Sequence, residues 1–228
     1  HGALYRGRPV GGFGSIGCFS SGVVKNIGAF GEAGFVTTRD EAIARRLRLL
    51  RAHGQEEKNV HQCYGTNGRL DELQAAVLRI KLRRLAERNA KRRDIARLYT
   101  EAFAALDLIP PWEDAQRVGV YHQYVTRTRQ RDALRAHLHE RGIETGVHYP
   151  TPLHRQPAWL THYRTRCSFP QAERSAQEIM SLPVFPDLTS EEVESVIDGV
   201  RSFFAQASAH LVRPGLSFVA PFYNEEGN

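Results

Sequence analysis

One lysine, Lys25, stands among short apolar residues and glycines in the segment Cys18–Ala29. Such surroundings partly remove water from its amine, and desolvation favours the neutral amine over the ammonium ion. A neutral amine is the form that attacks a carbonyl carbon and forms a Schiff base. Ser20, five residues earlier, carries a hydroxyl that could donate a hydrogen bond to a phosphate. On spacing alone, an ordinary solvated lysine in a loop remains the simpler interpretation.

The first half of the chain must supply the elements that position Lys25. Apolar runs bounded by glycine in residues 1–38 predict buried strands joined by tight turns. Thr38 and Glu41 have the spacing of a capping box, which predicts a helix that continues to about Ala52. A second helical pattern, with room for a break inside it, runs from about residue 70 to residue 105 and ends before Pro110.

From residue 110 onward the pattern alternates between strand and helix. Val120–Thr128 and Ile143–His148 are candidate strands, whereas Asp132–Arg141 and Gln171–Met180 are candidate helices. Thr189–Glu192 is a second capping box, and the helix that it starts has valines and isoleucine on one face. The helical pattern ends after residue 204. The order of elements predicts an α/β first part followed by a small α+β domain.

Composition limits the classes of protein to consider. The chain has 228 residues, of which 41% are hydrophobic and 25% charged, as is usual for a globular protein. Neither a secretory signal nor an apolar run long enough to span a bilayer is visible. The net charge of +6 comes largely from nine basic residues between Arg79 and Arg97. Without interleaved aromatic residues, this run indicates a solvated helix face or mild attraction of an anionic substrate rather than a nucleic-acid surface.

The cysteines indicate the compartment rather than a site. Cys18, Cys63 and Cys167 are odd in number and widely separated, so they suggest neither a disulfide framework nor a metal-binding pair. Free thiols of this kind fit a reducing, cytoplasmic setting.

Ordered blocks of residues over 1–205 resemble the DegT-type nucleotide-sugar aminotransferases. The blocks are Gly7-Arg8-Pro9-Val10-Gly11, Cys18-Phe19-Ser20, Lys25-Asn26-Ile27-Gly28-Ala29, Asn67-Gly68-Arg69-Leu70-Asp71-Glu72, Tyr121-His122-Gln123-Tyr124, Gly146-Val147-His148-Tyr149-Pro150 and Ser181-Leu182-Pro183. Their order along the chain matches that of the family, which makes the resemblance specific.

The resemblance implies roles for individual residues. Lys25 would form the Schiff base with pyridoxal 5'-phosphate (PLP) and move a proton to and from the substrate. Ser20 would bind the PLP phosphate, and Asn67 would reach the phosphate in the neighbouring subunit of a homodimer. His148 and Tyr149 would lie near the nucleotide-sugar substrate. The implied reaction converts a keto-sugar nucleotide to an amino-sugar nucleotide, with glutamate as amino donor.

The resemblance also implies a division of the chain. Residues 1–109 would be the C-terminal part of a fold-type I PLP-binding large domain, and 110–205 a small α+β domain. Residues 206–228 would be a linker followed by a segment, from Leu216, that resembles the opening strand of family 2 glycosyltransferases. The chain begins with His1 rather than Met, so we expect an incomplete copy of a longer enzyme.

Two departures from the family pattern affect the expected activity. Ser21–Val24 replaces larger residues or proline between the serine and the lysine. The family's Asp, which pairs with the pyridine nitrogen, and its Gln, which packs on the ring, would precede His1. Without that Asp the ring takes up electrons poorly, so we expect the isolated chain to bind PLP weakly and to have little activity.

Two other functions belong to the same fold. One is a non-catalytic relative that acts as a dimerising or regulatory module, for which a lysine at position 25 is unnecessary. The other is a dehydratase-like PLP enzyme, which would have histidine at position 25, and Lys25 argues against it.

Overall fold

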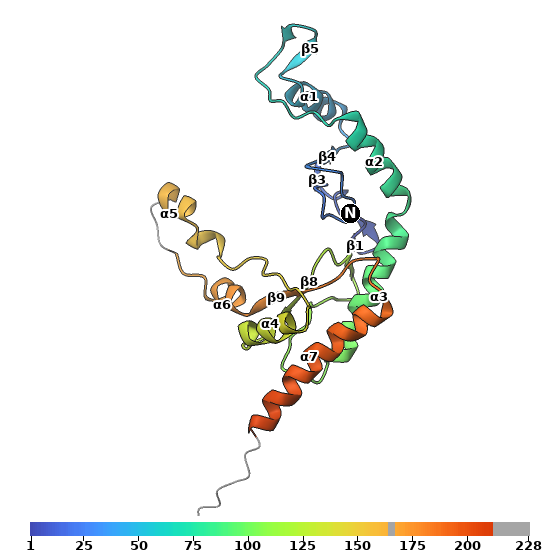
Figure 1. Cartoon of the computed structure of the whole chain (residues 1–228). Helices are drawn as coiled ribbons and strands as arrows, with labels where there is room; N and C mark the ends of the chain where they lie inside the picture. Colours follow the sequence, from blue (N-terminus) through green and yellow to red (C-terminus); the bar gives the residue numbers. More distant parts are fainter. Residues whose placement is uncertain (164–166, 212–228) are drawn as a thin grey trace, which may run out of the picture.

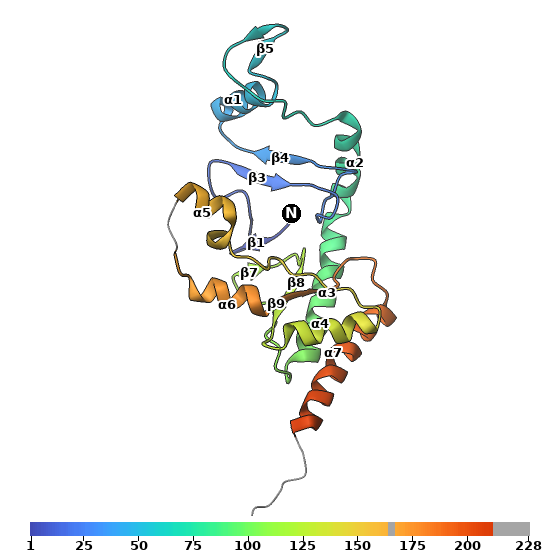
Figure 2. The same ribbon diagram turned by 60° about the vertical axis from the view of Figure 1, so that its left-hand side comes forward.

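The computed structural model describes residues 1–163 and 167–211. Two helices that follow each other almost directly, α2 (Glu72–Arg83) and α3 (Leu85–Phe103), form the long axis of the molecule (Figure 1). Elements from the first part of the chain lie along α2, and those from the last part surround α3 (Figures 1 and 2). The segment from Leu216 that resembles a glycosyltransferase strand lies outside the described residues.

The first part of the chain forms small antiparallel sheets. β1 (Leu4–Tyr5) pairs with β2 (Arg8–Pro9) and with β7 (Arg117–Val118), which comes from the second part of the chain. The other two sheets are hairpin pairs: β3 (Gly17–Ser20) with β4 (Gly34–Thr37), and β5 (Gln55–Glu57) with β6 (Val60–His61).

The strands predicted in residues 1–38 therefore form, but the prediction that they are buried is wrong. All four residues of β4 are exposed, and in β3 only Gly17 is buried. Among the described residues, no second layer covers this hairpin. A cavity of about 1170 Å³ instead lies between it and α1 (Glu41–Arg51).

The capping box predicted at Thr38 is not the one that forms. The N–H groups of Ala42 and Ile43 donate to Asp40 Oδ1 at 2.8 and 3.0 Å, so Asp40 caps α1. Thr38 instead donates through its hydroxyl to the Ser15 carbonyl and accepts from the Asp40 N–H. Asp40 lies directly before the helix, where a carboxylate also stabilises the positive end of the helix dipole.

The break predicted between residues 70 and 105 is confirmed. Arg84, with ψ near 3°, separates α2 from α3. The C-terminal half of α3 packs into the core of the second part of the chain through Ile95, Tyr99 and Phe103. The domain boundary at residue 109 stays a prediction.

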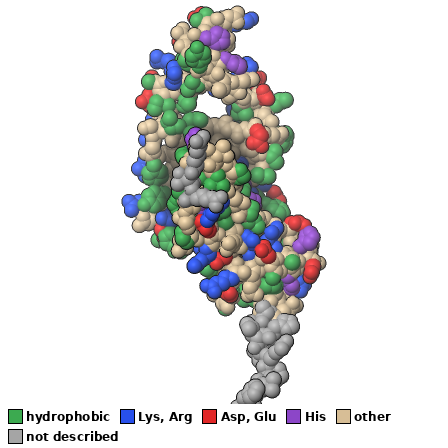
Figure 3. Space-filling model, turned by 90° about the vertical axis from the view of Figure 1, so that its left-hand side faces the viewer, with side chains coloured by type: hydrophobic (Ala, Val, Ile, Leu, Met, Phe, Trp, Pro, Cys, Tyr) green, Lys and Arg blue, Asp and Glu red, His purple; other side chains and the backbone are tan. Residues whose placement is uncertain are grey.

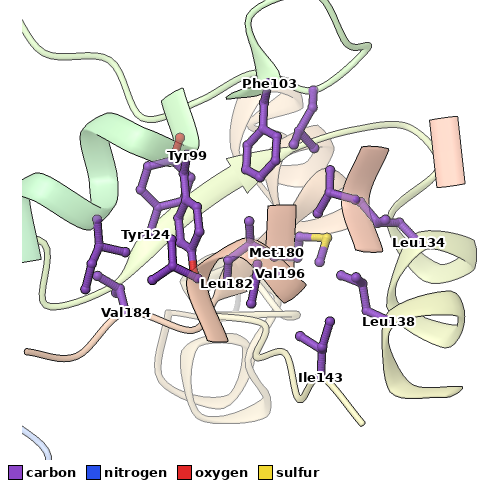
Figure 4. Packing of buried hydrophobic residues seen from close by; sticks show 14 of the residues in the cluster. Tyr99, Phe103, Tyr124, Leu134, Leu138, Ile143, Met180, Leu182, Val184 and Val196 are labelled. Atoms are coloured by element: carbon purple, nitrogen blue, oxygen red, sulfur yellow. The ribbon is translucent and has the colours of Figure 1, made fainter. Parts of the chain in front are cut away.

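A single core holds the second part of the chain together. β8 (Tyr124–Arg127) pairs antiparallel with β9 (Ile179–Leu182), with Tyr124 opposite Leu182. Helices α3, α4 (Arg131–Glu140) and α7 (Ser190–Leu211) pack against this two-stranded sheet, and their apolar side chains interdigitate (Figure 4). Tyr99, Tyr124, Leu134, Leu138, Met180 and Val200 are fully buried there.

Two predicted elements in this part are different. Ile143–His148 is not a strand, because its only described pairing is an isolated bridge between Gly146 and Ser181. The helix predicted over Gln171–Met180 is α6 (Pro170–Glu178), and Met180 belongs to β9, where its side chain enters the core. A short projection precedes α6, made of η1 (Leu153–Arg155) and α5 (Pro157–Tyr163).

The second capping box is confirmed at the start of α7. The Glu192 N–H donates to Thr189 Oγ1 at 3.2 Å, and the Thr189 N–H donates to Glu192 Oε2 at 2.8 Å. The helix continues to Leu211 and so includes the first part of the predicted linker, where alanines favour helix. None of the helices in residues 1–163 and 167–211 has the length and apolar character that crossing a membrane requires.

Candidate active site

Lys25 lies in a tight loop that follows β3. The Lys25 N–H donates to the Gly22 carbonyl at 2.9 Å, and the Ala29 N–H donates to the Ser21 carbonyl at 2.9 Å. A side chain at position 28 would collide with the Val23 carbonyl, so the loop closes only because residue 28 is glycine. The sequence therefore fixes the shape of the backbone that presents Lys25.

Hydrogen bonds with α2 and α3 hold this loop in place. The Asn26 side-chain amide donates to Asn89 Oδ1 in α3 at 2.8 Å and to the Val120 carbonyl at 2.9 Å. Asn89 is 2% exposed and also donates to the His1 carbonyl at 2.8 Å. From α2, Lys81 Nζ donates to the Gly28 carbonyl at 2.6 Å. The residue next to Lys25 is thus tied to both halves of the chain.

The Lys25 side chain is half-buried and has no fixed partner. In the part of the chain that the structure describes, its ammonium group makes no hydrogen bond and no ion pair. Two of the other three lysines provide a contrast: Lys81 is bonded to a carbonyl and Lys91 is paired with Glu87 at 3.5 Å, whereas Lys58 is exposed. A half-buried amine that is not bonded to another side chain remains available to a ligand.

His122 lies close enough to Lys25 for their charges to interact. Burial lowers the pKa of His122, and the positive charges of Lys25, Arg92 and His148 and of the amino terminus lower it further. Its Nδ1 atom is buried without a hydrogen-bond partner among the described residues. The charged groups that lower this pKa are all basic, although Glu144 and Glu192 also line the recess.

Arg92 places a positive charge near the site, but its Nη1 atom is already engaged in hydrogen bonds to backbone carbonyls. This guanidinium, 7% exposed, donates through Nη1 to the carbonyls of Val184 at 2.6 Å and Tyr121 at 3.0 Å, and more weakly to that of His122 at 3.5 Å. Arg92 belongs to the basic run that the sequence assigned to a solvated helix face, and for this residue that assignment is wrong. Its bonds fix the backbone of His122.

His148 lies on the other side of the site. Its Nδ1 atom is 2.9 Å from the Ser181 hydroxyl at the end of β9, and His148 and His122 both line a recess of about 510 Å³. Residue 146 must be small, because a side chain there would meet the His148 imidazole. Tyr149 is 71% exposed and contacts the His148 ring edge-on with 5.5 Å between ring centroids.

The other two predicted residues lie apart from this recess. Ser20 is exposed at the end of β3, opposite Gly34, and lines the larger cavity beside α1. Asn67 is exposed, bridges to Ala52 at the end of α1, and accepts from Arg69 Nε at 3.2 Å. Of the predicted residues, only His148 lines the recess; Lys25 is near enough for its charge to act on His122, and Ser20 and Asn67 lie elsewhere.

Sequence reasoning missed His122. It stands in a block that resembles the family, but its own sequence neighbourhood gives no signal of a role. The unpartnered Nδ1 atom and the surrounding cations appear only once the chain is folded.

Apolar side chains at the surface mark the first part of the chain. They surround an opening in the upper part of the face shown in Figure 3. Exposed apolar side chains of the first part of the chain include Val23, Val24, Phe30, Tyr64, Leu73 and Ile80. A contiguous exposed apolar surface is typical of regions that other protein segments cover.

Comparisons with known proteins identify the family. Residues 1–201 match the DegT/DnrJ/EryC1/StrS aminotransferase family, and the chain belongs to it. It is 44% identical over 204 residues to a dTDP-3-amino-3,4,6-trideoxy-alpha-D-glucose transaminase of Streptomyces venezuelae, covering 89% of this chain and 54% of that protein. It is 40% identical over 206 residues to a protein of Geobacillus stearothermophilus named pleiotropic regulatory protein, covering 89% of this chain and 55% of the relative.

Solved structures agree with this assignment. The crystal structure of S. venezuelae DesV in complex with a ketimine intermediate superposes with a TM-score of 0.85 at 43% identity, over 89% of this chain and 55% of DesV. The chain spans about half the length of the relatives that it matches. The chain is thus similar to sugar transaminases, and its α/β fold is that of the DegT family, which implies dependence on PLP.

The residues present fit PLP in charge and in chemistry. Lys25 offers an amine free of side-chain partners in the described structure, as formation of a Schiff base requires. Ser20, at the end of the strand that leads into the Lys25 loop, offers a hydroxyl to a ligand that carries a phosphate. The unpartnered Nδ1 of His122 is a buried polar atom that a ligand could satisfy.

Proposed function

We propose that this chain is part of a PLP-dependent aminotransferase that converts a keto-sugar nucleotide to an amino-sugar nucleotide, with glutamate as donor. The observation that carries the proposal is the free, half-buried Lys25 in cationic surroundings in a member of a sugar-aminotransferase family. A reducing, cytoplasmic setting fits the three free cysteines.

Each residue would have a defined task in the reaction. When bound, PLP supplies a carbonyl for the amine and a ring that takes up electrons from the substrate carbon. Lys25 Nζ would accept the proton that leaves the substrate carbon and hold it until it is delivered again. Ser20, directly before the Lys25 loop, would donate to the cofactor phosphate. His148 and Tyr149 would orient the sugar nucleotide at the edge of the recess.

A homodimer would complete the site. Asn67 is exposed and lies outside the recess that His122 and His148 line, so its side chain is available to a second subunit. The exposed apolar side chains of α2, Leu73 and Ile80, supply surface that a partner could bury. We propose that Asn67 reaches the phosphate held by the neighbouring subunit.

We further propose that the chain is an incomplete copy of the enzyme. The uncovered β3–β4 hairpin and the half-length match to relatives support this. The carboxylate that would pair with the pyridine nitrogen is expected upstream of His1, so the isolated chain should hold PLP weakly. A glycosyltransferase segment from Leu216 would make the parent a two-enzyme polypeptide. Stoichiometric PLP binding with full turnover by the 228-residue chain would overturn the proposal of an incomplete copy.

The test of catalysis is amination of a nucleotide-linked keto sugar by the full-length enzyme. Lys25→Ala should abolish amine transfer from glutamate, because no other lysine occupies the site. Lys91→Ala is the matched control and should keep normal turnover, since Lys91 pairs with Glu87 at the exposed surface of α3. Unchanged amination by Lys25→Ala would rule out the catalytic proposal.

The alternative function is a non-catalytic regulatory module. It is supported by the similarity to a relative named pleiotropic regulatory protein. A regulatory module would tolerate Lys25→Ala without loss of its role, whereas a transaminase would not. The same pair of variants therefore separates the two functions.

A further inference from the structure

Asn89 of α3 is a buried polar side chain that is bonded to the Lys25 loop. It is 2% exposed and makes two hydrogen bonds of 2.8 Å: its Oδ1 atom accepts from Asn26 Nδ2, and its Nδ2 atom donates to the His1 carbonyl. Asn26 directly follows Lys25, and its Nδ2 atom also donates to the Val120 carbonyl at 2.9 Å. Asn26 and Asn89 therefore link segments that are far apart in the sequence.

The bonding pattern fixes the orientation of both amide groups. A backbone carbonyl can only accept a hydrogen bond, so the amino group of Asn26 must face Val120, and that of Asn89 must face His1. The bond between the two side chains agrees with both orientations, because Asn89 then presents its oxygen to Asn26 Nδ2. Turning either amide around would bring like groups together, so the pair holds a single arrangement.

Arg92 lies one turn further along the same face of α3. Its Nη1 atom donates to the Tyr121 carbonyl at 3.0 Å, and Asn26 donates to the carbonyl of the preceding residue, Val120. Residues three apart in a helix are neighbours on its surface. This face of α3 therefore fixes the Lys25 loop and the Val120–Tyr121 backbone relative to each other.

Stability alone does not explain why this pair is polar. The Oδ1 atom of Asn26 is buried and has no hydrogen-bond partner among the described residues, and an unsatisfied buried acceptor lowers stability. Ile27 and Ala29, which are 3% and 1% exposed, already bury the apolar part of the loop. Apolar side chains in place of the two amides would leave no such atom unsatisfied. What a hydrogen-bonded pair adds is a unique geometry.

We propose that Asn26 and Asn89 are positioning residues, which set the direction of the Lys25 side chain by fixing its loop to α3. They act through the backbone of the loop and take no part in proton or group transfer. The inference rests on the proposed function, in which Lys25 must meet a carbonyl carbon at a defined distance and angle. Misplacing a reacting group by about 1 Å can slow a reaction by about 100-fold.

The first measurement follows the loop itself and does not depend on PLP. The Ala29 N–H donates to the Ser21 carbonyl and closes the loop, so its exchange with solvent deuterium, followed by NMR in the 228-residue chain, reports loop opening. In Asn89→Leu this amide should exchange faster by about tenfold or more, because the loop has lost a buried hydrogen bond. The Ser181 N–H, bonded to the Gly146 carbonyl, is the internal reference and should exchange as in the parent. Unchanged exchange of the Ala29 amide would overturn the proposal.

The second measurement follows the reactivity of Lys25. The chain is treated with pyridoxal phosphate and borohydride, and the amount of adduct at Lys25 is divided by that at the exposed Lys58. This ratio should fall by about tenfold or more in Asn89→Leu and in Asn26→Ala. The double variant should fall no further than the more affected single variant, because both substitutions break the same bond. Gln171→Leu, which changes an exposed amide of α6, is the control and should keep the parent ratio.

Asn89→Asp distinguishes positioning from a general structural role. A carboxyl group has the shape of the amide, and in either protonation state one of its oxygens accepts from Asn26 Nδ2. This variant should keep most of the preference for Lys25, whereas Asn89→Leu has the same branched skeleton without an acceptor and should lose it. An equal loss in the two variants, or an unchanged ratio in Asn89→Leu, would contradict the proposal.

The two measurements separate this inference from the proposed function. If the Ala29 amide responds as expected but the parent chain shows no preference for Lys25 over Lys58, the loop is anchored as inferred and it is the catalytic role of Lys25 that fails. If the parent chain prefers Lys25 and neither measurement responds to Asn89→Leu, the positioning role fails and the catalytic role stands.

Discussion

The two parts of the chain differ in how they use their apolar residues. Every residue of the buried core cluster lies at or after Ile95, in α3, β8, α4, β9 and α7 and the segments that join them. By contrast, α1 and α2 contain no buried residue, although both have an apolar stripe at helical spacing. The same kind of pattern therefore leads to burial in one part and to exposure in the other.

This difference shows that an apolar stripe predicts which face of a helix can be buried. Whether that face is buried depends on a second element that packs against it. The residues of the candidate site come from both parts: Lys25 from the first, exposed part, and His122 and His148 from the second, packed part. Asn89 of α3 bonds to the Lys25 loop through a partly buried hydrogen bond, and Arg92 of α3 bonds to the second part through a buried one. The packed part thus acts as the rigid support on which the Lys25 loop is mounted.

The largest expected effect is on the packing of the second part. Leu134→Ala removes a side chain that is fully buried in α4, and it should lower the free energy of unfolding by about 2–5 kcal/mol. The matched substitution Leu73→Ala, at a leucine that is 83% exposed in α2, should change it by less than about 0.5 kcal/mol. Urea unfolding measures both. Equal losses would show that the two parts do not differ in packing.

The next effect is on the loop that presents Lys25. Gly28→Ala places a methyl group against the Val23 carbonyl, so the loop must open at a cost of about 1–3 kcal/mol. The extent to which Lys25 reacts with PLP should therefore decrease as the loop opens. Gly14→Ala is the control, because the nearest atom to its new methyl group is the Ile16 carbonyl oxygen at 4.0 Å. If Gly28→Ala reacts like the parent chain, the closed loop does not position the lysine.

The smallest effect is on the pH dependence of stability. The pKa of His122 is lower in the folded chain than its ordinary value of 6.5, so the unfolded chain binds more protons just below pH 6.5. Stability from this group is complete above pH 6.5 and decreases as the pH falls below it. Urea unfolding at pH 7.5 and pH 5.5 should show a smaller loss for His122→Gln than for the parent chain. A larger loss in the variant would contradict the assigned direction of the shift.

At lower pH a second group, Glu173, makes stability depend on pH. Bonds from His154, the Phe169 N–H and Arg155 lower the pKa of Glu173 from 4.5 to about 2. Glu173 therefore stabilises the link between η1 and α6 above pH 4.5, and this contribution is lost as the pH falls toward 2. Glu173→Gln should remove this second decrease and leave the one near pH 6 unchanged, which separates the two groups in the same unfolding series.

Local sequence patterns predicted helices better than their caps or the short strands. Thr189 and Glu192 form their capping box as predicted, whereas at Thr38 the adjacent Asp40 competes successfully for the helix N–H groups. Ile143–His148 has the composition of a strand, but only one bridge to β9 forms. Pairing and capping depend on neighbours in space, which a pattern along the chain does not contain.

The candidate site was only partly predictable for the same reason. The immediate neighbours of Lys25 did not distinguish it from a solvated lysine. It could be predicted as a site residue only because ordered blocks of family residues surround it. His122 could not be predicted as a site residue, because its unpartnered nitrogen and its basic neighbours result from contacts between segments distant in sequence. Burial of Arg92 likewise depends on carbonyls almost 30 and 92 residues away.

Peptide mapping after reduction with borohydride tests the role of Lys25 most directly. The 228-residue chain is incubated with PLP, reduced and digested, and the adduct at each of its four lysines is measured by mass spectrometry. We predict an adduct concentrated at Lys25, present in less than one equivalent per chain and absent from Lys25→Ala. An adduct spread over Lys58, Lys81, Lys91 and Lys25 without preference would contradict the account.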